Sequence, residues 1–241
     1  MRSYHVLPGA LLVLALTAGA CSPRAPSDSS AGQDICASLM GAGNLASVSG
    51  SMASKDVEYA STGIPLQNLL ADLPAEGRTW RPGDDYYARE SAPCVFGPAD
   101  SRQSLTVEVG WFGAPFRSLQ SDWHRAGGDV LSGWWLHEDD SRYAFPCKIS
   151  GSHAGQQEQI PLSVRLHAKN LDGFTPELRS RVAAAVARTM ATRLHCVNKP
   201  TIPARLTTPA YRPSHPSPSP TSSPRYSTRS THSPGQAPAP A

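Results

Sequence analysis

The 241-residue sequence lacks the local patterns that identify the common enzyme classes. It contains no G-x-S-x-G, S-x-x-K or H-E-x-x-H pattern, no P-loop and no G-x-G-x-x-G. Its cysteines are widely spaced, whereas zinc sites usually contain close pairs such as C-x2-C. No apolar run reaches the roughly 20 residues that a membrane-spanning helix needs. We therefore predict no catalytic residue, no metal ligand and no cofactor, and the sequence favours a non-catalytic protein.

The first 20 residues have the features of an export signal. Arg2 precedes an apolar run, and the run ends in small residues at 18–20. Cys21 follows directly, so the segment resembles a bacterial lipoprotein signal, although that family usually has Leu or Val where Ala18 stands. The resemblance implies that the Cys21 sulfur carries a diacylglyceryl group, whose two chains anchor the protein to the outer face of the cell membrane. An ordinary secretory signal is the alternative.

Four cysteines remain if Cys21 carries lipid. An even number of cysteines in an extracytoplasmic chain predicts two disulfides, and the wide spacing disfavours zinc as the alternative. Four cysteines allow three pairings, between which the sequence alone does not choose. We favour Cys36–Cys94 and Cys147–Cys196, because each bridge closes a loop of about 50 to 60 residues and stabilises the fold by roughly 4 kcal/mol.

Composition divides the chain into four parts. They are a signal peptide at 1–20, the lipidated cysteine with a flexible tether at 21–33, an extracytoplasmic domain at 34–197 and a tail at 198–241. The tail has five basic residues and no acidic one, and it is rich in Pro, Ser and Thr. Such a segment buries too little apolar surface to fold, so we predict disorder. It is either a spacer or an electrostatic attachment to anionic lipids or wall polymers.

Alternation of apolar and polar residues predicts half-buried strands in the second half of the domain. In the segment 104–112, Leu105, Val107, Val109 and Trp111 share one side, and Thr106, Glu108 and Gly110 share the other. Segments 142–150 and 158–168 are predicted to be two strands of a hairpin, and 94–96 a short strand. Segment 78–90 is polar and is predicted to be a loop.

Helices are predicted at 34–44, 64–73 and 115–125, and the clearest one begins at Pro176. Thr175 precedes it as a cap, and a stripe recurs every fourth residue. The stripe consists of Leu178, Val182, Val186, Met190 and Leu194. Because an amphipathic helix that follows a hairpin packs back on the sheet, we predict an α+β fold. It would be a small antiparallel sheet with helices packed on one face, stapled by two disulfides.

Two neighbouring segments contain candidate ligand-binding residues. Trp134 and Trp135 would point to opposite sides of a strand, so one of them could offer an exposed ring to a sugar or a protein. The alternative, which we favour, is that both belong to the core. The acidic residues of 137–140 could bind a hard cation such as calcium, but they lack the spacing of a calcium loop. A solvated loop is the preferred interpretation, and the scattered histidines are assigned no role.

Several short segments of the domain resemble a group of uncharacterised lipoproteins from high-GC actinomycetes such as Streptomyces. The matching segments are 36–40, 93–96, 105–111, 145–147, 182–186 and 195–196. The resemblance covers most of the domain and excludes the tail. It implies a secreted, lipid-anchored protein, and it carries no established activity.

These observations together predict a non-catalytic binding or accessory module of the cell envelope. Its expected partners are the membrane, through the lipid on Cys21, and an envelope protein or a cell-wall polymer. Nucleic acid is not an expected partner, and the sequence does not predict an oligomeric state. An envelope hydrolase with an unrecognised site and a structural spacer are the alternatives.

Overall fold

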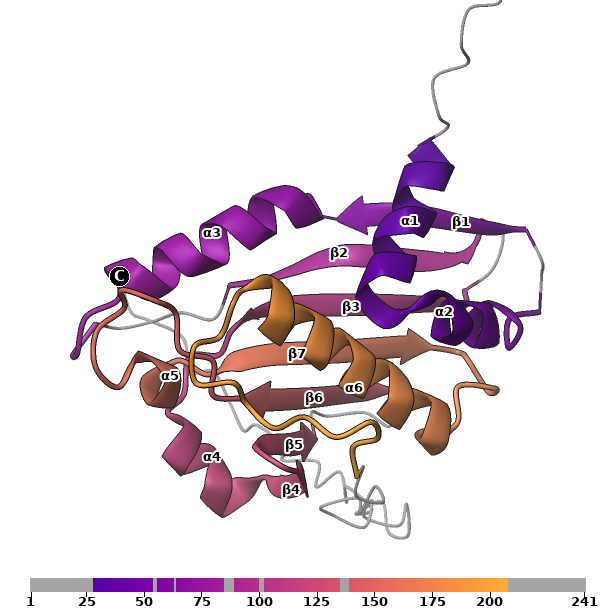
Figure 1. Cartoon of the computed structure of the whole chain (residues 1–241). Helices are drawn as coiled ribbons and strands as arrows, with labels where there is room; N and C mark the ends of the chain where they lie inside the picture. The colour runs from indigo at the N-terminus through magenta and orange to yellow at the C-terminus, as the bar shows by residue number, and fades with distance from the viewer. Residues whose placement is uncertain are drawn as a thin grey trace, which may run out of the picture. The chain divides into compact units, whose positions relative to one another are not determined.

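Seven antiparallel strands form one sheet in the order β1-β2-β3-β7-β6-β5-β4 (Figure 1). The computed structural model describes residues 28–53, 56–62, 64–84, 89–99, 102–134 and 139–207, and these strands lie within them. Their bounds are β1 Val57–Thr62, β2 Arg89–Pro98, β3 Ser104–Trp111, β4 His124–Gly127, β5 Val130–Trp134, β6 Asp140–Phe145 and β7 Leu162–Lys169. The predicted strands at 104–112, 142–150 and 158–168 correspond to β3, β6 and β7, and β6 pairs with β7 as expected.

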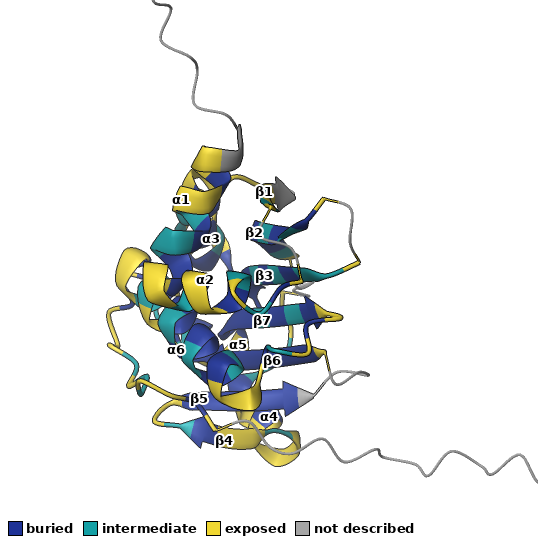
Figure 2. Cartoon of the chain, turned by 90° about the vertical axis from the view of Figure 1, so that its right-hand side faces the viewer, coloured by how far each residue is buried: buried dark blue, intermediate teal, exposed yellow. Residues whose placement is uncertain are grey.

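Six helices accompany the sheet within the described residues. They are α1 Asp28–Met40, α2 Ala42–Ser49, α3 Leu66–Thr79, α4 Phe116–Asp122, α5 Gln156–Gln159 and α6 Pro176–Arg193. Helices α1, α2, α3 and α6 cover one face of the sheet (Figures 1 and 2), which confirms the predicted α+β fold. The short α4 lies beside β5. None of the helices in the described ranges has the length and apolar character needed to cross a bilayer.

The core lies between the sheet and these four helices. The predicted apolar side of β3 is fully buried there, and its residues pair with apolar residues of β7, such as Val107 with Leu166 and Trp111 with Leu162. Trp111 is buried completely, and its indole Nε1 donates to Leu73 O of α3 at 3.0 Å. That bond satisfies the one polar atom of the ring. Tyr59 of β1 stacks on Phe96 with ring centroids 5.5 Å apart.

Helix α6 forms where the sequence predicts it. Thr175 precedes the helix, its hydroxyl accepts from Leu178 N at 3.3 Å, and the residues of the apolar stripe are buried. Helix α6 packs against α1 and β7. The single helix predicted at 34–44 is instead two helices, because the chain turns at Gly41, whose φ of 85° suits glycine.

Two disulfides connect the helical layer to the sheet. Cys36 of α1 is bonded to Cys94 of β2, and Cys147 after β6 is bonded to Cys196 after α6. All four cysteines are buried. Both expected disulfides are therefore confirmed, with the favoured pairing. Cys21, for which we predict lipidation, lies outside the described residues.

Residues 198–207 lie along the sheet after α6. Thr201 exchanges backbone and side-chain hydrogen bonds with Asp129 in the β4–β5 turn. Thr207 N donates to Ala126 O of the edge strand β4 at 2.7 Å, and Leu206 is buried. The described part of the domain thus extends past α6 and pairs with one edge of the sheet. Residues 208–241 lie outside the described part.

Candidate functional site

The face of the sheet turned away from α1 and α6, here called the second face, carries a charged cluster on four adjacent strands. The register aligns Glu108 of β3 with Arg165 of β7, and Arg165 with Arg142 of β6. Side chains of paired residues share a face, so these three groups lie side by side. We name this set the charged cluster: Glu90, Glu108, Asp140, Arg142, Ser163 and Arg165.

Arg165 is the centre of the cluster. Its Nε donates to both carboxylate oxygens of Asp140 at 2.9 and 3.0 Å, and its Nη2 donates to Asp140 Oδ2 at 2.5 Å. Its Nη1 donates to Glu108 Oε2 at 3.1 Å. Hydrogen bonds from one planar guanidinium to two carboxylates fix the orientation of all three groups. The side chains of Arg165 and Glu108 are 30% and 25% exposed, so this part of the cluster is reachable from solvent.

Arg142 is the more deeply buried arginine. Its Nη2 donates to Glu90 Oε2 at 2.6 Å, and the hydroxyl of the fully buried Ser163 donates to Glu90 Oε1 at 2.8 Å. The Arg142 guanidinium also lies over the Phe112 ring, 5.0 Å from its centroid. Phe112 in turn contacts Trp123, which follows α4, with centroids 5.3 Å apart. The cluster therefore adjoins an aromatic pair.

The two arginines differ in their electrostatic surroundings. The hydrogen bonds that Arg165 donates to Asp140 raise the pKa of Arg165, and the charges of Asp140 and Glu108 add to that effect. Burial lowers the pKa of Arg142, and the charge of Glu90 opposes that shift. Burying a charged group costs desolvation free energy, which an oppositely charged partner must offset. The cluster is therefore a preorganised set of charged donors and acceptors in which Arg142 and Asp140, the most buried charges, each have a partner.

Only some of the candidate ligand-binding residues that the sequence suggested lie within the described part of the chain. Trp134 ends β5, where its backbone pairs with Ser141, but its side chain and the whole of Trp135 lie outside the described residues. Residues 137 and 138 lie outside them as well. Asp140, the last residue of the suggested cation-binding segment, accepts hydrogen bonds from Arg165 instead. Among the described residues, no three His, Cys, Asp or Glu side chains are grouped as metal ligands.

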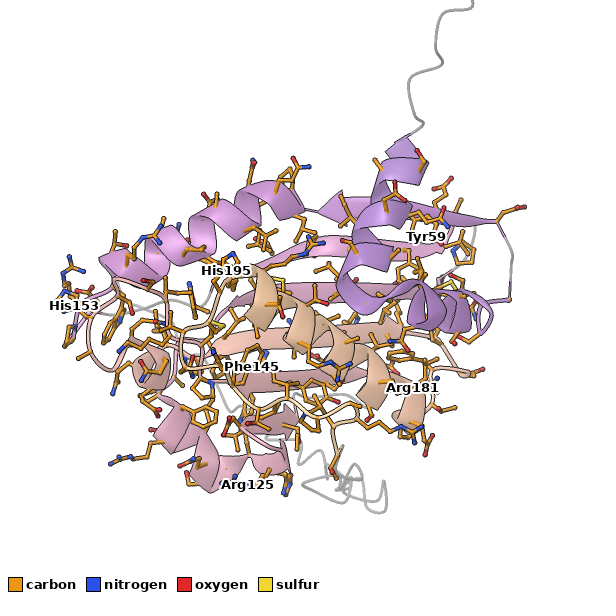
Figure 3. The ribbon with its side chains drawn as sticks, viewed as in Figure 1. Tyr59, Arg125, Phe145, His153, Arg181 and His195 are labelled. Carbon is orange, nitrogen blue, oxygen red and sulfur yellow. A yellow bond between two sulfur atoms is a disulfide. The ribbon has the colours of Figure 1, made fainter. Side chains whose placement is uncertain are left out.

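A second site lies at the C-terminal end of α6. A cavity of about 390 Å³ opens there between the helix and residues 195–202, and we name it the α6 pocket. Its polar lining consists of Arg188, Thr192, His195 and Lys199. Its apolar lining consists of Ala191, Cys196, Pro200 and Ile202. His195 is labelled in Figure 3 beside this end of α6. Among the described residues, none of those that line the cavity is acidic.

Comparisons with known proteins identify no relative. No family model matches the chain, and no curated protein or solved structure matches it significantly. Any function must therefore be inferred from the two sites themselves.

Proposed function

We propose that the protein is a lipid-anchored, non-catalytic binding module of the cell envelope that holds its ligand on the second face of the sheet. The observation that carries the proposal is the charged cluster. Helices α1, α2, α3 and α6 cover the other face, whereas α4 covers only part of this one, where Phe116 and Leu119 pack with Leu131 and Ala144. Next to that apolar contact, arginines and carboxylates lie in fixed geometry beside an aromatic pair. Donors and acceptors placed side by side suit a hydroxyl-rich cell-wall polymer, and the half-buried ring of Trp123 adds apolar contact with a sugar ring.

The same geometry argues against the hydrolase alternative. Ser163 donates to a carboxylate, as an activated nucleophile would, but its side chain is completely buried beneath the cluster. A nucleophile must reach the reacting atom of its substrate. Glu108 and Asp140 both accept hydrogen bonds from Arg165, an arrangement that fixes these side chains in place. The cluster is therefore suited to holding a ligand rather than to transforming it.

Binding to purified cell walls tests this proposal. We expect the chain to sediment with insoluble walls, and Glu108→Gln to weaken the binding about fivefold because it disrupts one charge-assisted hydrogen bond at the exposed part of the cluster. Glu58→Gln is the matched control, since Glu58 is exposed on β1 outside the cluster. Equal binding by both variants, or no sedimentation of the parent chain, would contradict the proposal. Release of soluble wall fragments that Ser163→Ala abolishes would support a hydrolase.

The proposed anchor is tested separately at Cys21. We expect the parent chain to partition into detergent and the Cys21→Ser variant to remain in the aqueous phase, because the variant lacks the sulfur that would carry the acyl chains. The measurement is detergent phase separation followed by mass spectrometry of the N-terminal peptide. A Cys21→Ser variant that still partitions into detergent would refute the anchor, while leaving the binding proposal to the cell-wall experiment.

A further inference from the structure

The α6 pocket combines basic and hydroxyl groups with an apolar wall. Arg188 and Lys199 contribute a guanidinium and an ammonium group, and His195 and Thr192 add hydrogen-bonding side chains. The apolar wall is built from both sides of the cavity, with Ala191 on the helix and Ile202 on the returning chain. The volume is in the range of small-ligand cavities. The lining therefore suits an anionic group attached to a small carbon skeleton.

The backbone of the pocket adopts a conformation that side chains normally avoid. His195 has a φ of 52° and Lys199 a φ of 46°. His195 N donates to Thr192 O and Cys196 N donates to Ala191 O, which is the hydrogen-bond pattern of a helix end that usually has glycine at the position of His195. An L-residue in the left-handed region is strained, and such strain is concentrated at functional sites. Here the two residues with strained backbones, His195 and Lys199, both line the same cavity.

The walls of the pocket are held rigidly. The Cys147–Cys196 disulfide ties its base to the end of β6, and Val197 N donates to Lys148 O at 2.9 Å. The Nη1 atom of Arg188 donates to Pro203 O at 2.7 Å, which fixes both the guanidinium and the returning chain. A site whose backbone is fixed before binding loses less entropy when the ligand arrives.

We propose that the α6 pocket binds a phosphate ester, whose oxygens are held by Lys199, Arg188 and His195. A phosphate group has several acceptor oxygens and a charge of up to about −2, which matches two cations with further donors better than a single carboxylate does. The apolar wall receives the carbon part of the ester. This site is separate from the charged cluster on the second face. The phosphate-ester proposal can therefore be tested independently of the wall-binding function.

Titration with glycerol 3-phosphate, followed by the backbone amide signals of the full chain in NMR, tests the proposal. We expect saturable shifts confined to residues 188–202, which include the whole lining of the pocket, and no such shifts from sodium chloride at equal ionic strength. Lys199→Gln should weaken the affinity about tenfold, since it removes a charged hydrogen-bond donor. Arg193→Gln is the control: it removes the same charge from an exposed position at the end of α6 that does not line the cavity, and it should change the affinity less than twofold.

His195→Gly provides a second variant that keeps the fold, because glycine is the preferred residue at that helix end. It should also weaken the binding of glycerol 3-phosphate. Unchanged affinity in both Lys199→Gln and His195→Gly, or shifts that sodium chloride reproduces, would overturn the proposal. Lipid vesicles identify the source of the ester. If phosphatidylglycerol vesicles, but not phosphatidylcholine vesicles, compete with glycerol 3-phosphate for the pocket, the ligand is a lipid headgroup. Absence of competition supports a soluble ester.

Discussion

Glu90 is the carboxylate that neutralises the more deeply buried arginine of the charged cluster. It accepts from both Arg142 and Ser163, and its side chain is only 12% exposed. We predict that Glu90→Gln lowers the free energy of unfolding by about 3 kcal/mol, because it leaves the buried Arg142 charge without its carboxylate. Urea denaturation measures the effect. Glu58→Gln, on the exposed surface of β1, should change stability by less than about 0.5 kcal/mol. Equal effects of the two changes would contradict this account of the cluster.

His195, unlike Glu90, lowers the stability of the fold through its backbone conformation. Its φ of 52° is costly for any residue with a Cβ atom, so His195→Gly should raise the free energy of unfolding by about 1 kcal/mol. His195→Ala keeps the Cβ atom and should give no comparable gain. The same urea measurement separates the two variants. A gain from alanine as large as the gain from glycine would show that the imidazole, rather than the backbone, causes the strain.

The first turn of α6 is stabilised by a side-chain cap. The Thr175 hydroxyl caps Leu178 N, so Thr175→Ala should destabilise the protein by about 1 kcal/mol in thermal or urea unfolding. Thr175→Ser keeps the hydroxyl and should cost much less. Equal losses in both variants would mean that the methyl group, rather than the cap, is important.

The same turn makes stability depend on pH. The Glu177 carboxylate accepts a hydrogen bond from the backbone amide of Glu177 and one from the Thr175 hydroxyl. These bonds lower the pKa of Glu177 below its ordinary 4.5. Because the folded pKa is lowered, the stabilising effect is present above 4.5 and is lost as the pH falls through the folded value. We predict that Glu177→Gln lowers the melting temperature at pH 7 and has no such effect in stronger acid. A difference that persists unchanged in acid would contradict this.

Elements with a strong hydrophobic period could be predicted from the sequence, and those without one could not. The alternation in β3 and the stripe in α6 correspond to buried faces. Strands β4 and β5 escaped prediction because they are short and contain glycines, such as Gly133, whose close approach to the Trp123 ring leaves no room for a side chain. Strand β1 is too poor in apolar residues to show a clear alternation: of its described side chains, Val57 and Tyr59 pack against the core at the edge of the sheet.

The charged cluster was missed for a related reason. The alternation placed Glu108 on the polar side of its strand, but charged residues on a strand are ordinarily assigned to solvent. Segment 78–90 was predicted to be a loop, whereas Glu90 lies in β2. Only the register of four strands shows that carboxylates and guanidinium groups meet. Long-range pairing of this kind leaves no local signal, and neither does the helix end that forms the α6 pocket.

At the scale of the whole molecule, the disulfides make the largest predicted contribution to stability. They close loops with sequence separations of 58 and 49 residues, and each should contribute roughly 4 kcal/mol by constraining the unfolded chain. We predict that the double variant Cys147→Ser/Cys196→Ser unfolds at markedly lower urea concentration than the parent. Adding reductant to the parent chain should lower its stability further than this variant does, because reduction breaks both bridges. A variant as stable as the oxidised parent would contradict the prediction.

The order of strands also determines when folding can finish. The centre of the sheet joins β3 to β7, and the first helix packs against the last. Contacts between such distant parts of a chain form late. A polypeptide that is synthesised N-terminus first therefore cannot complete its core until β7 and α6 have been made, and until then β3 lacks its partner strand β7.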